Sequence, residues 1–247
     1  TAYSAKTIAL LSNTKRTDLD KSNFNPAYDI PPTIIQGTNR SERINGTDEG
    51  EWIYAYNGFD TINAQGGDDR LYGGYGNDTL NGGDGNDELY GEMDDDRIFG
   101  GNGDDRLTGG DGTDYLDGGN GSDTYIVDDE RDTIKDTGTD SGIDTVIYRY
   151  VSDKYVMGDG IEKVVLPSFV STKNMTVMGN KESNDISTGD GNDVVMAGSG
   201  DDIIYTASGN DKVEAGAGND LIIGGDGAGD DIYDGGSGID TIKYTSA

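Results

Sequence analysis

Apolar positions recur every nine residues along most of this chain. Cut in register from Gly37, the sequence gives ten consecutive nonapeptides ending at Ile126, each with an apolar eighth position, from Ile44 to Tyr125. Positions 7 to 9 are rich in Thr, Ile, Leu and Tyr, which favour strands, whereas positions 1, 2 and 4 are mostly Gly, which favours turns. The pattern predicts one short strand and one turn per unit, with the eighth side chain pointing inward.

The pattern is interrupted once. It weakens after Val127, residues 147–178 contain fewer Gly and more Val, Tyr and Met, and the units resume at Gly179. A turn and a strand, repeated, wind a coil in which two units complete one turn. The predicted fold is therefore all-β: a parallel β-roll, that is, a right-handed β-helix or solenoid with two nonapeptides per turn.

The repeat pattern divides the chain into four parts. They are an N-terminal cap or remnant of an upstream domain (1–36), a first repeat block (37–146), a β-rich bridge (147–178) and a second repeat block (179–247). In the bridge, Val164 and Leu166 alternate as inward-facing strand residues would, so we expect extra strands there. The start at Thr1 and the stop directly after a repeat suggest a processed or excised fragment.

A second column, at position 6, is acidic. It reads Glu in the first two units, Asn184 at the start of the second block, and Asp at Asp60, Asp69, Asp78, Asp87, Asp96, Asp105, Asp114, Asp123, Asp193, Asp202, Asp211, Asp220, Asp231 and Asp240. Coiling brings such carboxylates to about 5 Å from one another, where each pair repels by roughly 3 kcal/mol at an effective dielectric near 20. Ca²⁺ takes six to eight oxygens from carboxylates and main-chain carbonyls, and glycine-rich turns present such carbonyls. We therefore expect several Ca²⁺ ions as cofactors, with folding coupled to their binding.

The net charge and the lack of Cys and His exclude several classes of partner and activity. The chain carries 48 acidic and 18 basic residues, a net charge of −30, with no Cys and no His. Such a charge disfavours nucleic acid and anionic membranes as partners, and no stretch is apolar enough to span a bilayer. Without Cys or His there is no Ser-His or Cys-His pair and little prospect of a zinc site, so we expect no catalysis in this chain.

The units 73–81 (GGYGNDTLN) and 82–90 (GGDGNDELY) resemble the G-G-x-G-x-D-x-U-x nonapeptide of the RTX family, a calcium-binding repeat. The resemblance covers about residues 37–146 and 179–243. It implies that calcium is bound by the Asp of two stacked units and by carbonyls at positions 1 and 3. One site would use Asp78 and Asp96 with the carbonyls of Gly73, Tyr75, Gly91 and Met93. The next would use Asp87 and Asp105, and the remaining carbonyl ligands in this block would come from Gly82, Asp84, Gly100, Asn102, Gly109, Asp111, Gly118 and Asn120.

The resemblance also implies a setting. RTX proteins are exported by type I secretion, stay unfolded in the low-calcium cytosol and fold outside the cell. The chain would then be a calcium-dependent module of a larger secreted protein such as a toxin, or alternatively a structural segment of a surface-layer protein or adhesin. Calcium, further domains of the same polypeptide and cell-surface components are the implied partners. An enzyme or an ice-binding domain is less favoured, since position 3 carries no Thr ladder.

Some positions depart from the motif. Glu42, Glu51 and Asn184 replace Asp, so we expect these ends to bind calcium weakly or to act as caps. Two extra residues around Ala228 and Gly229 put the calcium site at Asp231 in question.

Overall fold

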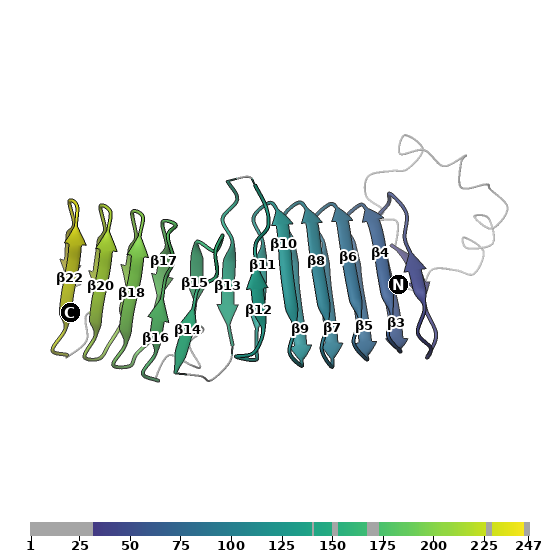
Figure 1. Ribbon diagram of the computed structural model, residues 1–247, viewed down its shortest axis with the longest axis horizontal. Coiled ribbons are helices and arrows are strands. Elements are labelled where there is room, and N and C mark those ends of the chain that lie inside the picture. The colour runs from purple at the N-terminus through teal and green to yellow at the C-terminus, as the bar shows by residue number, and fades with distance from the viewer. Residues whose placement is uncertain (1–31, 140, 150–152, 167–172, 226–228, 245–247) are drawn as a thin grey trace, which may run out of the picture. The chain divides into compact units, whose positions relative to one another are not determined.

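The computed structural model describes residues 32–139, 141–149, 153–166, 173–225 and 229–244 (Figure 1). The chain forms two units, Thr1–Pro32 and Thr33–Ala247. Nearly all of the first unit, and with it most of the predicted N-terminal cap, lies outside the described residues. The second unit contains both repeat blocks and the bridge between them.

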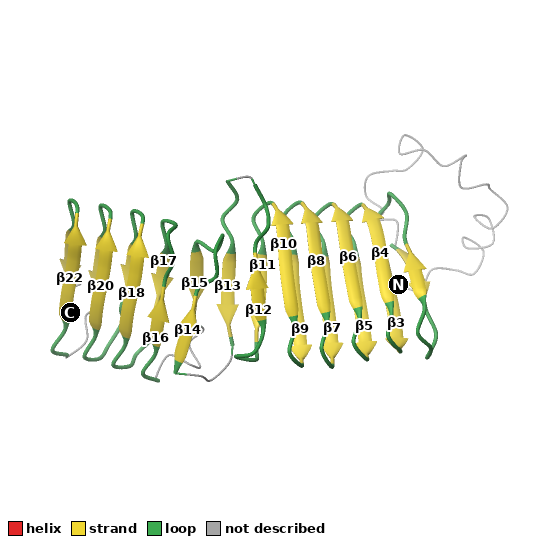
Figure 2. Cartoon of the chain, in the orientation of Figure 1, coloured by secondary structure: helices red, strands yellow, loops and turns green. Residues whose placement is uncertain are grey.

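The second unit is built from strands and loops, and its described residues contain no helix (Figure 2). Odd-numbered strands form one sheet of twelve: β1 (Thr33–Gln36), β3 (Glu51–Asn57), β5 (Arg70–Tyr75), β7 (Glu88–Met93), β9 (Arg106–Asp111), β11 (Thr124–Val127), β13 (Thr145–Tyr148), β15 (Lys163–Val165), β17 (Asp185–Ser187), β19 (Ile203–Tyr205), β21 (Leu221–Gly224) and β23 (Thr241–Tyr244).

Even-numbered strands form two further sheets. The first contains β2 (Arg43–Asn45), β4 (Thr61–Gly66), β6 (Thr79–Asp84), β8 (Arg97–Asn102), β10 (Tyr115–Asn120) and β12 (Thr133–Lys135). The second contains β14 (Lys154–Val156), β16 (Thr176–Met178), β18 (Val194–Ser199), β20 (Lys212–Ala217) and β22 (Ile232–Ser237).

All neighbouring strands are parallel, and their register confirms two repeats per turn. Leu71 pairs with Leu89 and Leu80 pairs with Ile98, each one coil of two nonapeptides further on. Consecutive units therefore alternate between the two faces of the coil, as Figure 1 shows. The prediction of an all-β parallel roll is confirmed.

A thin core lies between the faces. The eighth-position residues are fully buried from Ile53 to Leu116, and Tyr125 is buried as well. Where position 1 carries a side chain it also points inward, since Ala64 and Ala197 are fully buried. Each Leu or Ile buried in this way contributes roughly 1.5–3 kcal/mol, and each coil supplies only a few such residues, so the core alone is small.

The glycine positions have two different roles. Gly74 and Gly76, at positions 2 and 4, have φ of 113°, where L-residues other than Gly are disfavoured. Gly73, at position 1, is required for space: a Cβ there would lie 2.6 Å from Asp78 Oδ2 and 2.8 Å from the carbonyl oxygen of Gly91. The strands are also longer than predicted, because β5 extends beyond positions 7 to 9 through the glycines to position 3.

The bridge continues the coil on one face and breaks it on the other. β11, β13, β15 and β17 pair in succession, so the first sheet runs unbroken from one repeat block to the other. Val164 and Leu166 are buried, as their alternation indicates. On the opposite face the sheet ends at β12 and restarts at β14, near the centre of Figure 1.

Candidate metal centre

The position-6 Asp side chains form ladders from coil to coil. Each lies directly before a strand, and all but Asp231 and Asp240 are buried. The Oδ1 atom of each accepts a hydrogen bond from the main-chain N–H at the corresponding place in the preceding coil. Asp78 donates to Asp96 over 2.7 Å, and Asp87 donates to Asp105 over 2.8 Å. The residues that the sequence assigned to one shared site are therefore direct neighbours.

The second carboxylate oxygen, Oδ2, is buried without a hydrogen-bond partner in many of these residues. Oδ2 is buried and has no hydrogen-bond partner in Asp60, Asp69, Asp78, Asp87, Asp96, Asp105, Asp114, Asp202 and Asp220. A buried polar atom without a partner costs about 1–3 kcal/mol, and more when it is charged. A repeated row of such oxygens is what a row of bound cations would satisfy.

Burial shifts the acid–base equilibrium of the same groups. It raises the pKa of Asp96 and of Asp105 to about 8 and that of Asp78 to about 7, and neighbouring carboxylates add to the shift. The hydrogen bond that each Oδ1 accepts from a main-chain N–H lowers the pKa, but this effect is weaker than that of burial. Ionising these carboxylates in the folded roll is therefore unfavourable unless positive charge is close by.

Main-chain oxygens face the same spaces. The carbonyl of Gly91 and Oδ2 of Asp78 both approach the position that a Cβ on Gly73 would fill. The Tyr75 carbonyl accepts one hydrogen bond, from the Gly58 N–H over 2.8 Å, and a carbonyl oxygen has a second lone pair. Each gap between coils thus combines a buried carboxylate with carbonyl oxygens, a donor set that suits a hard cation such as Ca²⁺.

The position-3 residues point their side chains away from these gaps. Tyr75 is 61% exposed and Met93 is 40% exposed. The side chains of Asp84, Asn102, Asp111 and Asn120 are exposed as well. The carbonyl oxygens of Tyr75, Asp84, Asn102 and Asn120 each accept a hydrogen bond from a position-4 N–H of the preceding coil, and their assignment as calcium ligands stays a prediction.

The extra residues near Ala228 do not displace the second block. Asp211 donates its N–H to Asp231 Oδ1 over 2.9 Å, and Asp220 donates to Asp240 Oδ1 over 3.1 Å, although both pairs are 20 residues apart. The register at Asp231 is therefore preserved. Asp231 and Asp240 belong to the last coil described and are only half-buried.

Three residues not assigned to the site extend the ladders to the end of the first block, at Asp132 and Asp144, and into the bridge, at Glu162. Asp114 donates to Asp132 Oδ1 over 3.0 Å, Asp123 donates to Asp144 Oδ1 over 2.8 Å, and Asp144 donates to Glu162 over 2.9 Å. Burial raises the pKa of Asp144 to about 7 and that of Asp132 to about 6. The signal was present in the sequence, because Asp132 and Asp144 each precede an apolar residue by two positions.

The position-4 carbonyls were not among the possible ligands predicted from the sequence. The carbonyl oxygen of Gly58 points at Gly76 of the following coil, and that of Gly67 points at Gly85. These oxygens also face the space between coils. Their direction depends on the loop conformation, which the repeat pattern does not specify.

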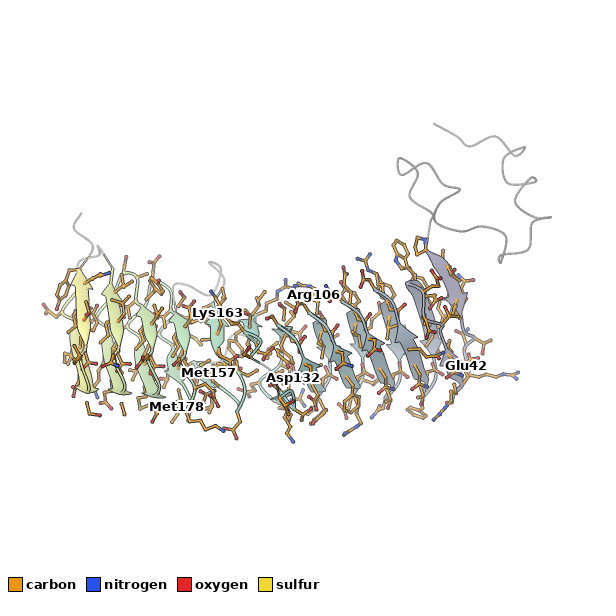
Figure 3. The ribbon with its side chains drawn as sticks, turned by 90° about the horizontal axis from the view of Figure 1, so that it is seen from above. Glu42, Arg106, Asp132, Met157, Lys163 and Met178 are labelled. Carbon is orange, nitrogen blue, oxygen red and sulfur yellow. The ribbon has the colours of Figure 1, made fainter. Side chains whose placement is uncertain are left out.

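The ends of the ladders are different. Glu51 is fully buried, but its carboxylate bends back to accept hydrogen bonds from the N–H and the hydroxyl of Thr47 in its own loop. Asn184 likewise accepts from the N–H of Asn180 over 3.1 Å. Glu42 lies near the N-terminal end of the ladders and Asp132 near the break between β12 and β14 (Figure 3). The side chain of Glu51 thus bonds within its own loop, whereas that of Asn184 also donates to the Ile161 carbonyl of the preceding coil over 3.1 Å. The role of these residues as caps stays a prediction.

Two further findings apply to the described residues. No three acidic side chains there converge as in a carboxylate-only metal site. Nor does that part of the chain contain a helix able to cross a membrane.

Comparison with known proteins agrees with this geometry. The RTX calcium-binding nonapeptide repeat model matches the chain at residues 45–80, 72–107, 90–125, 99–134, 178–213 and 205–242. A search of curated proteins gave no match. The repeat matches cover both blocks and more than half of the sequence, and they coincide with the coils whose Asp residues form the ladders. The chain therefore belongs to the family of RTX calcium-binding nonapeptide repeats.

Proposed function

We propose that this chain is a calcium-dependent folding module of a larger secreted protein. The observation that carries the proposal is the row of buried Asp Oδ2 atoms without hydrogen-bond partners. Those of Asp78, Asp87, Asp96 and Asp105 lie beside carbonyl oxygens of the neighbouring coil. In such a module the cation is part of the fold, because it compensates charge that the thin core cannot accommodate.

The donors present fit calcium in number and kind. In one gap, Asp78 and Asp96 would hold the ion with the carbonyls of Gly73, Tyr75 and Gly91, joined by that of Met93. Asp87 and Asp105 would do the same on the opposite face with their own loop carbonyls. When bound, the ion supplies the positive charge that permits both carboxylates to stay ionised.

Coupled folding explains how such a chain suits export. With a net charge of −30 and little apolar surface, the unliganded chain resembles a disordered sequence, and ion binding shifts it to the roll. A chain unfolded in a low-calcium cytosol and folded outside is compatible with type I secretion. We therefore infer an extracellular or cell-surface location, with the roll contributing to export and stability rather than to catalysis.

A calcium titration tests the proposal directly. Circular dichroism in chelator is expected to show a largely disordered chain at neutral pH, and millimolar Ca²⁺ is expected to induce β-structure. Fluorescence of the single tryptophan, Trp52 in β3, reports on the first block in the same titration. Titration calorimetry counts the ions. An unchanged spectrum with calcium, or a compact roll in excess chelator at neutral pH, contradicts the proposal.

A rigid spacer in a surface-layer protein or adhesin is the second candidate. The observation that favours it is the first sheet, which continues through the bridge from β1 to β23 without a break. The sequence of the full precursor separates the two: a catalytic or toxin domain upstream favours the export module, and adhesin domains or further repeats favour the spacer.

A further inference from the structure

A second ladder of hydrogen bonds runs through position 5, which the repeat motif leaves open. The N–H of Asp104 donates to Asn86 Oδ1 over 2.9 Å, and the N–H of Ser122 donates to Asp104 Oδ1 over 2.9 Å. In each case the acceptor belongs to the preceding coil. This direction is opposite to that of the position-6 ladder, in which the acceptor belongs to the following coil.

The second block repeats the arrangement. Asn192 donates to Asn174 Oδ1 over 2.8 Å, Asn210 donates to Asn192 Oδ1 over 2.8 Å, and Asp230 donates to Asn210 Oδ1 over 2.7 Å. Every acceptor residue is Asp, Asn or Ser, which carry an oxygen close to the main chain. The ladder thus requires a side-chain type at a position that the motif does not constrain.

The two ladders hold each loop from both sides. At Asn86 the N–H points to Asp68 Oδ1 of the preceding coil, over 3.0 Å, and at Asp87 the N–H points to Asp105 of the following coil. Because the N–H and C=O of a trans peptide point in opposite directions, the first bond turns the Gly85 carbonyl toward the following coil. That carbonyl does face Gly103, its counterpart one coil later.

We propose that the position-5 side chain is a positioning residue for calcium binding, an inference that rests on the proposed function. By accepting the loop N–H of the following coil, it holds that donor toward the preceding coil with its hydrogen bond satisfied, and it turns the attached carbonyl toward the gap on the other side of that loop. An N–H pointing into a cation site would repel the ion. The side chain itself does not need to touch the ion.

Natural exceptions occur in the first block. Phe59 stands at position 5 and has no acceptor, and the Asn77 N–H, which would bond to it, makes no such bond among the described residues. The next step, from Asp95 to Asn77, lacks the bond too. There Asp94 replaces the position-4 glycine and accepts from the Gly76 N–H over 3.0 Å instead.

A loss-of-contact series tests the proposal. Asn86→Ala is expected to raise the calcium concentration at the folding midpoint about three- to tenfold, as loss of one hydrogen bond predicts. Hydrogen exchange of the Asp104 amide should accelerate in the calcium-loaded variant. Asn86→Asp, which keeps the acceptor, is expected to restore both values.

The matched control is Asn81→Ala. Asn81 also bridges coils, donating its side-chain N–H to Asn63 Oδ1 over 3.0 Å and to the Ile62 carbonyl over 3.1 Å, but it accepts no loop N–H and belongs to no candidate site. Its loss is expected to move the midpoint less than twofold. Equal shifts for Asn86→Ala and Asn81→Ala would mean that position 5 only adds stability, which overturns the proposal.

A gain-of-contact variant covers the case in which Asn86→Ala does not fold. Phe59 is 68% exposed, so Phe59→Asn removes little packing and gives the Asn77 N–H an acceptor. Compared with Phe59→Ala, it is expected to lower the calcium midpoint about threefold. No difference between the two contradicts the inference while the calcium response of the unaltered chain still supports the proposed function. An unaltered chain that does not respond to calcium overturns both.

Discussion

Asp78 donates its main-chain N–H to Oδ1 of Asp96 over 2.7 Å, so the two residues of one candidate site are joined directly by a hydrogen bond. The same carboxylate keeps its Oδ2 buried and without a partner. One oxygen therefore fixes the spacing of the coils and the other remains for a ligand. Substitution of a single Asp can separate these two roles.

Replacing Asp87 by Asn removes the carboxylate charge but keeps the hydrogen bond between coils. Asn retains Oδ1, which accepts the Asp69 N–H over 2.8 Å, but it cannot be ionised. We expect local calcium affinity to fall roughly tenfold or more, because affinity at such sites follows ligand charge. In chelator the variant should be more folded than the parent chain, because a neutral amide replaces a buried carboxylate that has no partner for Oδ2.

Calorimetry measures the ions bound and circular dichroism measures the metal-free fold. Thr79→Ala, on a strand in the same block, serves as the control and should change calcium binding much less. Equal losses from both substitutions would contradict the ligand assignment of Asp87.

The metal-free roll should be more stable in acid than in base. Burial raises the pKa of Asp96 and Asp105 from the ordinary value of 3.8 to about 8. A raised acid pKa means that the folded state prefers the protonated form, so its stabilisation is complete below about pH 4 and is lost as pH rises to 8. In chelator we therefore expect more β-structure at pH 5 than at pH 8.

With calcium present the dependence should reverse, because protons compete with the ion for the same carboxylates and weaken binding as pH falls. Spectra recorded from pH 4 to 9, in chelator and in calcium, test both directions. A metal-free chain that gains structure between pH 5 and 8 would show that the buried carboxylates do not control folding.

Position 2 offers a test of backbone conformation. Glu92 occupies this position with φ of 82°, where most units have Gly. Glu92→Gly is expected to stabilise the calcium-loaded protein by about 1 kcal/mol, because it relieves a left-handed conformation. The reverse change, Gly101→Ala at φ of 124°, is expected to destabilise it by about 1–3 kcal/mol. Thermal unfolding in saturating calcium measures both; a destabilised Glu92→Gly would contradict the argument.

The tyrosine stack on the outer face should affect stability but not calcium binding. Tyr72 lies between Tyr54 and Tyr90, with ring centroids 4.7 Å and 5.1 Å away. Tyr72→Ala is expected to lower the free energy of unfolding by about 1–3 kcal/mol through lost stacking and burial. The number of ions bound should stay the same, and Tyr72→Phe should behave nearly as the parent. A change in ion number would link this face to the sites.

The repeating columns made the scaffold predictable. Leu71 and Leu80 recur at one phase, so inward side chains, parallel pairing and two repeats per turn followed from spacing alone. The contacts within a loop were less accessible. Asn86 stands at an unconstrained position, and its proposed role depends on Asp104 in the following coil, a contact that only the folded register reveals. Asp144 follows the repeat phase in the sequence, but its pairing with Asp123 does not follow from the repeat, because the two are 21 residues apart rather than the usual 18.

The sheet that continues through the bridge has a consequence for the order of folding. Each strand of a coil like this contacts only its neighbours, so a folded coil provides the template on which the next one adds. Because the first face is continuous, a nucleus in either block can grow into the other without a new initiation event. Growth along the opposite face must restart at β14, so a partly folded chain is expected to pause at that point, with one block assembled and the other still open.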